Sequence, residues 1–261
     1  MILVDVHAHL DHAMFRNDLD EVIERAKLAG MWAIITNGIN PETNRRALEI
    51  AEKYGIVKPA LGIYPIDALQ NEIARGEYPL KDNVFDVEDE LKFIEKQREK
   101  IVAIGEIGLD FSQSEQRDEQ NEVFIRLLEL AQRIRKPVIV HSRKAEQEVI
   151  EVLESTNVKK VVLHCFCGKL KLVKQGADNG WYFSVPTNVV RSQQFQLMVN
   201  EVDVRQLLTE TDAPYLSPFR GKRNEPSFIV ESVKKISELL GREKEEVTEQ
   251  IVRNYQKIFE H

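Results

Sequence analysis

The sequence is poor in cysteine and has no long apolar run, and both absences narrow the class of protein. Its 261 residues include only two cysteines, Cys165 and Cys167, which lie too close together for an ordinary disulfide framework. No apolar stretch reaches the roughly 20 residues of a membrane-spanning helix, and the first residues lack the pattern of a secretory signal. We therefore expect a cytoplasmic protein with no membrane partner, whose cysteines form a reduced, packed pair rather than a thiolate metal site.

Positive charge is also in deficit, since the formal net charge is −7. The surface as a whole therefore repels nucleic acid, and a polyanion would have to be met by a local basic patch or by metal ions. Hydrophobic residues make up 43% of the chain, enough to bury one large core, so we expect residues 1–261 to form a single domain. The sequence leaves the oligomeric state open, with a monomer as one option.

Eight short apolar runs alternate with segments of helical periodicity. The runs are rich in valine, isoleucine and leucine without polar alternation, which is typical of parallel strands covered on both faces. The predicted strands are residues 2–9, 32–39, 57–63, 101–107, 138–141, 161–166, 181–185 and 207–212. This alternation predicts a (β/α)8 TIM barrel. A doubly wound sheet is the alternative, weakened because no glycine-rich phosphate loop follows the first strand.

Apolar residues at helical spacing predict the segments between these strands. The predicted helices include residues 17–29, 87–99, 145–153, 169–175, 195–201, 228–240 and 244–259, a helix that starts at Asn40-Pro41, and a long amphipathic helix with Ser114 as its N-cap. Residues 66–86 are mostly polar and irregular. We interpret them as a long surface loop that includes one helical turn.

Histidines and carboxylates gather at the predicted carboxyl ends of the strands, where the loops of a βα barrel form its working rim. Six residues stand there: His7, His9, Glu106, His141, His164 and Asp212. Four imidazoles and two carboxylates suit a pair of divalent transition-metal ions, with Glu106 able to bridge them. The alternative is a rim of buried polar networks without metal.

Two more carboxylates lie one step deeper on the same strand faces. Alternation along a strand places Asp5 below His7 and Glu210 below Asp212. We expect both to orient ligand imidazoles or to balance charge. If the alternation drifts near Glu210, that side chain faces a helix instead.

Six segments stand in order along nearly the whole chain: VDVHAHLD, GEIGLDF, KPVIVHSR, VLHCF, ETDAPYLSP and RGKRNEP. Together they resemble the TatD-type deoxyribonucleases of the amidohydrolase superfamily. The resemblance implies a two-metal hydrolase that cuts DNA phosphodiester bonds, as an exonuclease that favours single strands or 3′ ends. It also implies that Mg, Mn or Zn ions bind in two groups: His7, His9 and Asp212 hold one ion, His141 and His164 hold the other, and Glu106 is shared.

Within this interpretation, a few residues receive individual roles. Asp212 is the candidate general base, because it is the carboxylate ligand that is not expected to bridge, and Glu106 is counted with it in the catalytic centre. Arg143, Arg220 and Lys222 are candidate phosphate contacts, although a solvated charge run is an equal alternative. Tyr64 stands where the family usually has the histidine of Gly-x-His-Pro; we interpret it as a substrate contact that keeps a hydrogen-bonding tip.

Two other functions compete with the nuclease. A small-molecule amidohydrolase of the phosphotriesterase or lactonase type often bridges its metals with a modified lysine on the fourth strand, whereas this chain has Glu106 there and no lysine in residues 101–107. A non-catalytic protein with a relict metal site is weakened by the complete set of six ligands. DNA and RNA, or chain ends and internal sites, are not separated by the sequence.

Overall fold

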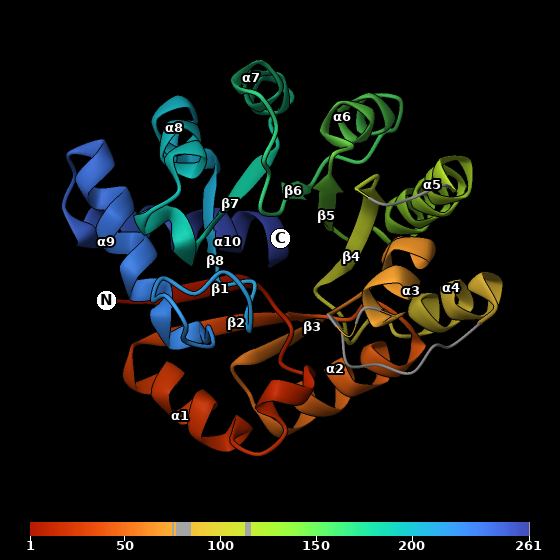
Figure 1. Ribbon diagram of the computed structural model, residues 1–261, viewed down its shortest axis with the longest axis horizontal. Coiled ribbons are helices and arrows are strands. Elements are labelled where there is room, and N and C mark those ends of the chain that lie inside the picture. The colour runs from red at the N-terminus through yellow and green to blue at the C-terminus, as the bar shows by residue number, and fades with distance from the viewer. Residues whose placement is uncertain (75, 77–84, 113–115, 261) are drawn as a thin grey trace.

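Eight parallel strands form one sheet in sequence order, from β1 to β8, in a computed structural model that describes residues 1–74, 76, 85–112 and 116–260. Figure 1 shows the strands arranged as a barrel with helices around its outside. The strands are β1 (Leu3–Ala8), β2 (Met31–Asn37), β3 (Val57–Leu61), β4 (Ala103–Asp110), β5 (Val138–Arg143), β6 (Val161–Leu163), β7 (Tyr182–Pro186) and β8 (Leu207–Glu210). The predicted TIM barrel is confirmed.

The barrel is nearly closed, because β8 returns to lie beside β1. A single parallel bridge joins Ala8 and Ala213, and the backbone N–H of Asp212 donates to the carbonyl of His7 at 2.8 Å. Below them, the Thr209 hydroxyl donates to the Val4 carbonyl at 2.6 Å. Residues from the two ends of the chain are therefore neighbours at the carboxyl ends of these strands.

Helices cover the outer face of the sheet with apolar stripes. In α9, for example, Ile229, Val233 and Ile236 are buried at helical spacing. The helices are α1 (Leu19–Leu28), α2 (Pro41–Lys53), α3 (Ile66–Ala74), α4 (Val87–Lys96), α5 (Arg117–Ile134), α6 (Glu146–Glu154), α7 (Leu170–Asp178), α8 (Gln193–Glu201), α9 (Ile229–Leu240) and α10 (Lys244–Phe259). The last helix contacts both β1 and β8 and passes behind β8 in Figure 1.

One sequence expectation was wrong, because residues 66–74 form the helix α3 and not a loop. Ile66, Leu69 and Ile73 stand at helical spacing in this segment, and Leu69 is buried in a small cluster with Ile39 and Tyr64, against which Ile73 packs. This short apolar stripe lies beside a long polar stretch, and the loop interpretation missed it. Residues 75 and 77–84 lie outside the described residues. So does Ser114, the expected N-cap, and α5 begins at Arg117.

The two cysteines are both free thiols. Cys165 is partly buried against the core, whereas Cys167 is exposed. The two thiols contact each other, but the expectation that the pair is packed is wrong for Cys167, whose side chain is exposed.

In the described part of the chain, no helix has both the length and the apolar character needed to cross a membrane.

Candidate metal centre

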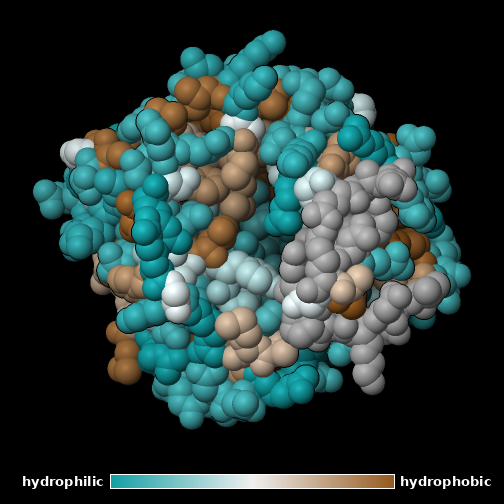
Figure 2. All heavy atoms as spheres, in the orientation of Figure 1, coloured by the Kyte–Doolittle hydropathy of each residue, from teal (hydrophilic) through white to brown (hydrophobic). Residues whose placement is uncertain are grey.

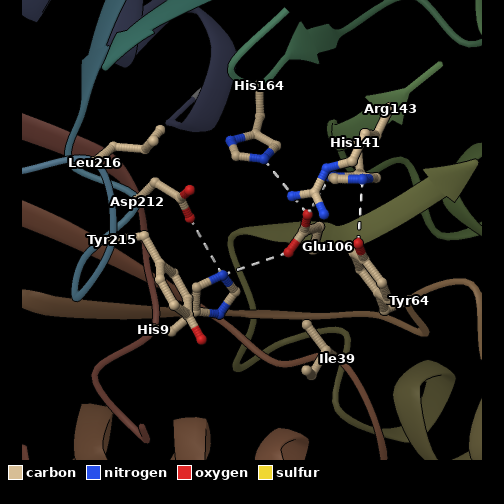
Figure 3. A pocket seen from close by; sticks show the side chains of 10 residues that line it. All are labelled: His9, Ile39, Tyr64, Glu106, His141, Arg143, His164, Asp212, Tyr215 and Leu216. Atoms are coloured by element: carbon tan, nitrogen blue, oxygen red, sulfur yellow. Dashed lines mark hydrogen bonds and ion pairs between the residues drawn. The ribbon is translucent and has the colours of Figure 1, made fainter. Parts of the chain in front are cut away.

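The carboxyl ends of the strands surround a pocket of about 440 Å³. Figure 2 shows the molecule hollowed near the middle of this face, and Figure 3 shows the pocket from close by. Its lining residues come from almost every strand end: His9, Ile39, Tyr64, Glu106, His141, Arg143, His164, Asp212, Tyr215 and Leu216.

Four side-chain atoms form a compact group on one side of this centre. The Nε2 atoms of His7 and His9 lie 3.2 Å apart. Oε2 of Glu106 lies 3.5 Å from each of these nitrogens, and Oδ1 of Asp212 lies 3.7 Å from His7 and 3.5 Å from His9. Ligands about 2.0–2.1 Å from one tetrahedral ion are separated by roughly 3.4 Å. The observed separations are close to this spacing, so these atoms could hold one cation.

The other oxygen of Glu106 faces a second pair of imidazoles. Oε1 lies 2.9 Å from Nδ1 of His141 and 3.4 Å from Nε2 of His164. All three residues are buried. One carboxylate thus faces two separate nitrogen groups, which is the arrangement of a ligand that bridges two ions.

Hydrogen bonds behind two of the imidazoles determine which ring nitrogen faces the centre. Nδ1 of His9 lies 3.1 Å from the carbonyl oxygen of Asn37, and Nδ1 of His164 lies 3.0 Å from Oε2 of Glu210. Because both partners are acceptors, each Nδ1 carries the hydrogen and each Nε2 keeps its lone pair. These rings are held in the tautomer that a metal ligand requires.

The electrostatics of the centre favour positive charge between the carboxylates. Burial by itself would raise the pKa of Glu106, but the imidazoles of His7, His141 and His164 outweigh it and hold that pKa well below its usual value. For His9, burial opposes protonation, but the hydrogen bond and charge of Asp212 and the charge of Glu106 raise the pKa to about 9. A buried group of nitrogen and carboxylate donors with this bias fits divalent cations.

Backbone geometry brings Glu106 this close to its neighbours. A Cβ atom on Gly62 would lie 2.3 Å from the carbonyl oxygen of Glu106, and one on Gly108 would lie 2.1 Å from the carbonyl oxygen of His141. Only glycine allows β3, β4 and β5 to approach to this degree. The glycines of the GIYP and GEIG segments therefore place the Glu106 carboxylate.

The two deeper carboxylates differ in what they contact. Glu210 is fully buried and accepts hydrogen bonds from His164 at 3.0 Å and from the Ser184 hydroxyl at 2.6 Å, so it faces the barrel interior and not a helix. Asp5 accepts from the backbone N–H of His7 at 3.2 Å and from both the N–H and the hydroxyl of Thr211. Asp5 therefore joins β1 to β8 and supports the backbone of His7 and not its ring.

Two of the four candidate substrate contacts lie in the pocket and two lie outside it. Tyr64 and Arg143 line the pocket, whereas Arg220 and Lys222 are exposed on the loop after β8 and are not among its lining residues within the described chain. The neighbouring Arg223 makes two hydrogen bonds to Asp18, at 2.8 and 2.6 Å. Part of the basic RGKRNEP segment is thus structural.

Asp110 is a site residue that the sequence analysis did not single out. It is fully buried at the end of β4, and its Oδ2 atom accepts a hydrogen bond from the Tyr64 hydroxyl at 3.0 Å. Burial opposes its ionisation, but the contacts with His141 and Ser112 lower its pKa. The signal was its position in the GEIGLDF segment, four residues after Glu106.

Comparisons with known proteins agree with this geometry. The family profile described as TatD related DNase matches residues 4–260. Deoxyribonuclease TATDN3 of Homo sapiens is 37% identical over 263 residues, which cover 98% of this chain and 94% of that protein. A Bacillus subtilis protein named as the uncharacterized metal-dependent hydrolase YabD is 33% identical over 267 residues, 99% of each chain.

Solved structures show the same likeness. A TatD homolog from Escherichia coli K12 superposes with a TM-score of 0.86 at 27% identity, covering 99% of this chain and 98% of the other. A mutant organophosphorus hydrolase from Deinococcus radiodurans has a TM-score of 0.66 at 14% identity, covering 98% and 92%. At that identity, the second likeness concerns the fold alone.

Proposed function

Because this chain belongs to the TatD-related DNase family, we propose that it hydrolyses phosphodiester bonds of DNA at a centre of two divalent metal ions. That it is a metal-dependent hydrolase acting on ester bonds follows from the family. The observation that carries the finer proposal is the orientation of Glu106, whose Oε2 faces His7 and His9 while its Oε1 faces His141 and His164.

The proposed ligands divide into two groups that share Glu106. His7, His9 and Asp212 hold the first ion, and His141 and His164 hold the second. When bound, divalent ions such as Mg²⁺, Mn²⁺ or Zn²⁺ lower the pKa of water from about 15.7 towards roughly 7 and offset the negative charge that develops on the phosphate.

The reaction breaks one P–O ester bond and forms one P–O bond from water. Asp212 acts as the general base through Oδ2, because its Oδ1 faces His7 and His9. Although burial opposes ionisation, the neighbouring imidazoles lower the pKa of Asp212, so its carboxylate is ready to accept the proton of the attacking water at neutral pH. The departing oxygen acquires one proton, which balances the one that Asp212 removes.

Basic side chains hold the substrate around this point. Arg143 lines the pocket with its Nη1 atom 3.5 Å from Oδ2 of Asp110. Its side chain is nevertheless 54% exposed, so a phosphate group can reach the guanidinium. Arg220 and Lys222 contact phosphates further along the strand, outside the pocket. A single-stranded 3′ end suits a pocket of about 440 Å³, which is too small for a duplex.

The test is to incubate metal-free protein with end-labelled single-stranded and double-stranded DNA, adding one divalent ion at a time. We expect cleavage only in the presence of an ion, with mononucleotides released from the 3′ end of single strands. A circular single strand reports cleavage at internal sites, and an RNA strand of the same sequence reports sugar selectivity. Glu106→Gln is the matched inactive control, because it keeps the side-chain shape but cannot bridge two cations with two charged oxygens.

Parallel assays with a lactone and a phosphotriester address the small-molecule alternative. Turnover of either compound without cleavage of any DNA would overturn the nuclease proposal. The cytoplasmic location stays a prediction, to be checked by fractionation, and sedimentation determines the oligomeric state that the sequence leaves open.

A further inference from the structure

Asp110 is a buried carboxylate outside the group of six proposed ligands, and its orientation is fixed from two sides. Its backbone is held by Gln120 of α5, which accepts from the Asp110 N–H at 2.9 Å and donates to the Asp110 carbonyl at 2.9 Å. Its Oδ1 atom accepts from the N–H of Ser112 at 2.8 Å and from the Ser112 hydroxyl. Only Oδ2 is therefore directed to the metal centre.

The Oδ2 atom of Asp110 and the hydroxyl of Tyr64 lie in contact, next to the proposed metal ligand His141. Oη of Tyr64 lies 3.0 Å from this oxygen and 3.2 Å from Nε2 of His141, while Nε2 of His141 lies 3.5 Å from the same carboxylate oxygen. All three side chains are buried. Figure 3 shows Tyr64 and His141 on the same side of the pocket, joined by a dashed line.

The chemistry of these groups sets the direction of each hydrogen bond. An ionised carboxylate only accepts, so the single hydroxyl hydrogen of Tyr64 points to Asp110. The phenolic oxygen is then left as an acceptor for the Nε2–H of His141. With one ring hydrogen held on Nε2, Nδ1 is the nitrogen left to face Oε1 of Glu106 at 2.9 Å. Nδ1 carries a hydrogen only while the ring is charged, and its lone pair is available to a cation that replaces that hydrogen.

We propose that Tyr64 and Asp110 act together as positioning residues, which hold His141 in the tautomer and orientation needed to bind the second metal ion through Nδ1. This inference rests on the proposed two-ion centre. It gives Tyr64 a role other than the substrate contact expected from its place in the GIYP segment, because the hydroxyl is directed to Asp110 and His141.

The inference concerns one ion and not the other. His9 and His164 have their own acceptors behind them, Asn37 and Glu210, whereas the contacts of Tyr64 with the proposed ligands run to His141. Loss of the phenol is therefore expected to affect the second ion alone. Removal of a hydrogen-bond partner behind a ligand typically weakens metal binding 10- to 100-fold.

The test is a calorimetric titration of metal-free protein with Zn²⁺, repeated with Mn²⁺, for the unaltered chain and its variants. We expect Tyr64→Phe to weaken the second binding event about 10- to 100-fold and to leave the first within about twofold. Tyr215→Phe is the matched control: its hydroxyl lines the same pocket but lies 3.3 Å from His12, so both binding events should be unchanged.

Two further variants separate positioning from a merely structural role. Tyr64→His offers an imidazole that can accept from His141 and donate to Asp110, so we expect it to restore most of the lost affinity. If Tyr64 and Asp110 act through the same imidazole, the double variant Tyr64→Phe/Asp110→Asn should lose no more affinity than the weaker-binding single variant. If circular dichroism shows that Asp110→Asn does not fold, the comparison of Tyr64→Phe with Tyr64→His and Tyr215→Phe still tests whether Tyr64 positions His141.

An unchanged second binding event in Tyr64→Phe would overturn the inference, as would equal weakening by Tyr215→Phe. If the unaltered protein binds two ions but cuts no DNA, the proposed function fails while the role of Tyr64 can still be measured. If Tyr64→Phe binds both ions normally and DNA is cut, the role of Tyr64 fails and the function stands. Binding of a single ion by the unaltered protein would overturn both.

Discussion

The Nε2 atoms of His7 and His9 lie 3.2 Å apart. Two ring nitrogens at this distance repel each other unless a proton or a cation lies between their lone pairs. Glu106 and Asp212 add two carboxylate oxygens within 3.7 Å of the same nitrogens. The folded chain therefore brings together groups whose mutual repulsion a divalent cation relieves.

Removal of metal ions should destabilise the fold. An ion at 100 times its dissociation constant raises the free energy of unfolding by about 2.7 kcal/mol, which corresponds to roughly 5 to 10 °C in Tm for a chain of this size. Calorimetric scans with added Zn²⁺ and with excess chelator measure the difference. Equal Tm values in the two scans, with no ion detected by elemental analysis, would contradict the metal centre.

Asp212→Asn should separate metal binding from hydrolysis. The amide oxygen can still face His7 and His9, but the side chain no longer accepts a proton from water, so we expect the hydrolysis rate to fall by about 10²- to 10⁴-fold. The measurement is a single-turnover rate on end-labelled DNA together with the ion content of the same sample. Asp203→Asn, at an exposed carboxylate paired with Arg205, is the control and should keep the full rate. A near-normal rate in Asp212→Asn would show that another group is the base.

The barrel and its six convergent residues could be predicted from the sequence because both depend on strong, local signals. Eight valine- and isoleucine-rich runs, each followed by helical periodicity, leave few alternatives to a parallel barrel. His7, His9, His141 and His164 stand within two residues of a strand end, and Glu106 lines the same pocket from the middle of β4. Once the strands are in place, the convergence of their carboxyl ends follows from the topology.

The remainder of the site depends on contacts that no local pattern carries. The partnership of Tyr64 with Asp110, for example, joins residues 46 positions apart. Arg223 belongs to the same basic segment as Arg220, yet the packing of α1 against the loop after β8 directs it to Asp18. These details follow from the tertiary structure and not from the motif.

The difference between these arginines predicts different effects on DNA binding. Each phosphate contact on single-stranded DNA contributes about 0.7 to the slope of log affinity against log salt concentration. We expect Arg220→Gln and Lys222→Gln each to reduce that slope by about this amount, and Arg223→Gln to leave it unchanged because its guanidinium is occupied by Asp18. Each variant also carries Asp212→Asn, which prevents cleavage of the DNA. Fluorescence anisotropy at several salt concentrations then gives the slopes. Identical slopes for all three variants would remove Arg220 and Lys222 from the proposed DNA path.

Stability should depend on pH through the ion pairs that attach the loop after β8 to α1. Glu225 is largely buried and accepts two hydrogen bonds from Arg25, at 2.8 and 2.7 Å. Burial opposes the ionisation of Glu225, but Arg25 and Ser227 lower its pKa below the usual value of 4.5. A carboxyl whose pKa is lower in the folded state stabilises the fold above its unfolded pKa, and this contribution is lost as the pH falls through the folded pKa.

Glu225→Gln should therefore be destabilising at pH 7, by about 2 kcal/mol as expected for hydrogen bonds to a charged group, and much less so below the folded pKa of Glu225. Urea unfolding of both proteins between pH 7 and pH 3 measures the difference at each pH. Glu24→Gln is the control. Glu24 pairs with Lys27 in solvent on α1, the helix that also carries Arg25, and an ion pair in solvent contributes little. A difference between Glu225→Gln and the unaltered chain that stays constant over this range would show that the carboxyl acts through its shape and not through its charge.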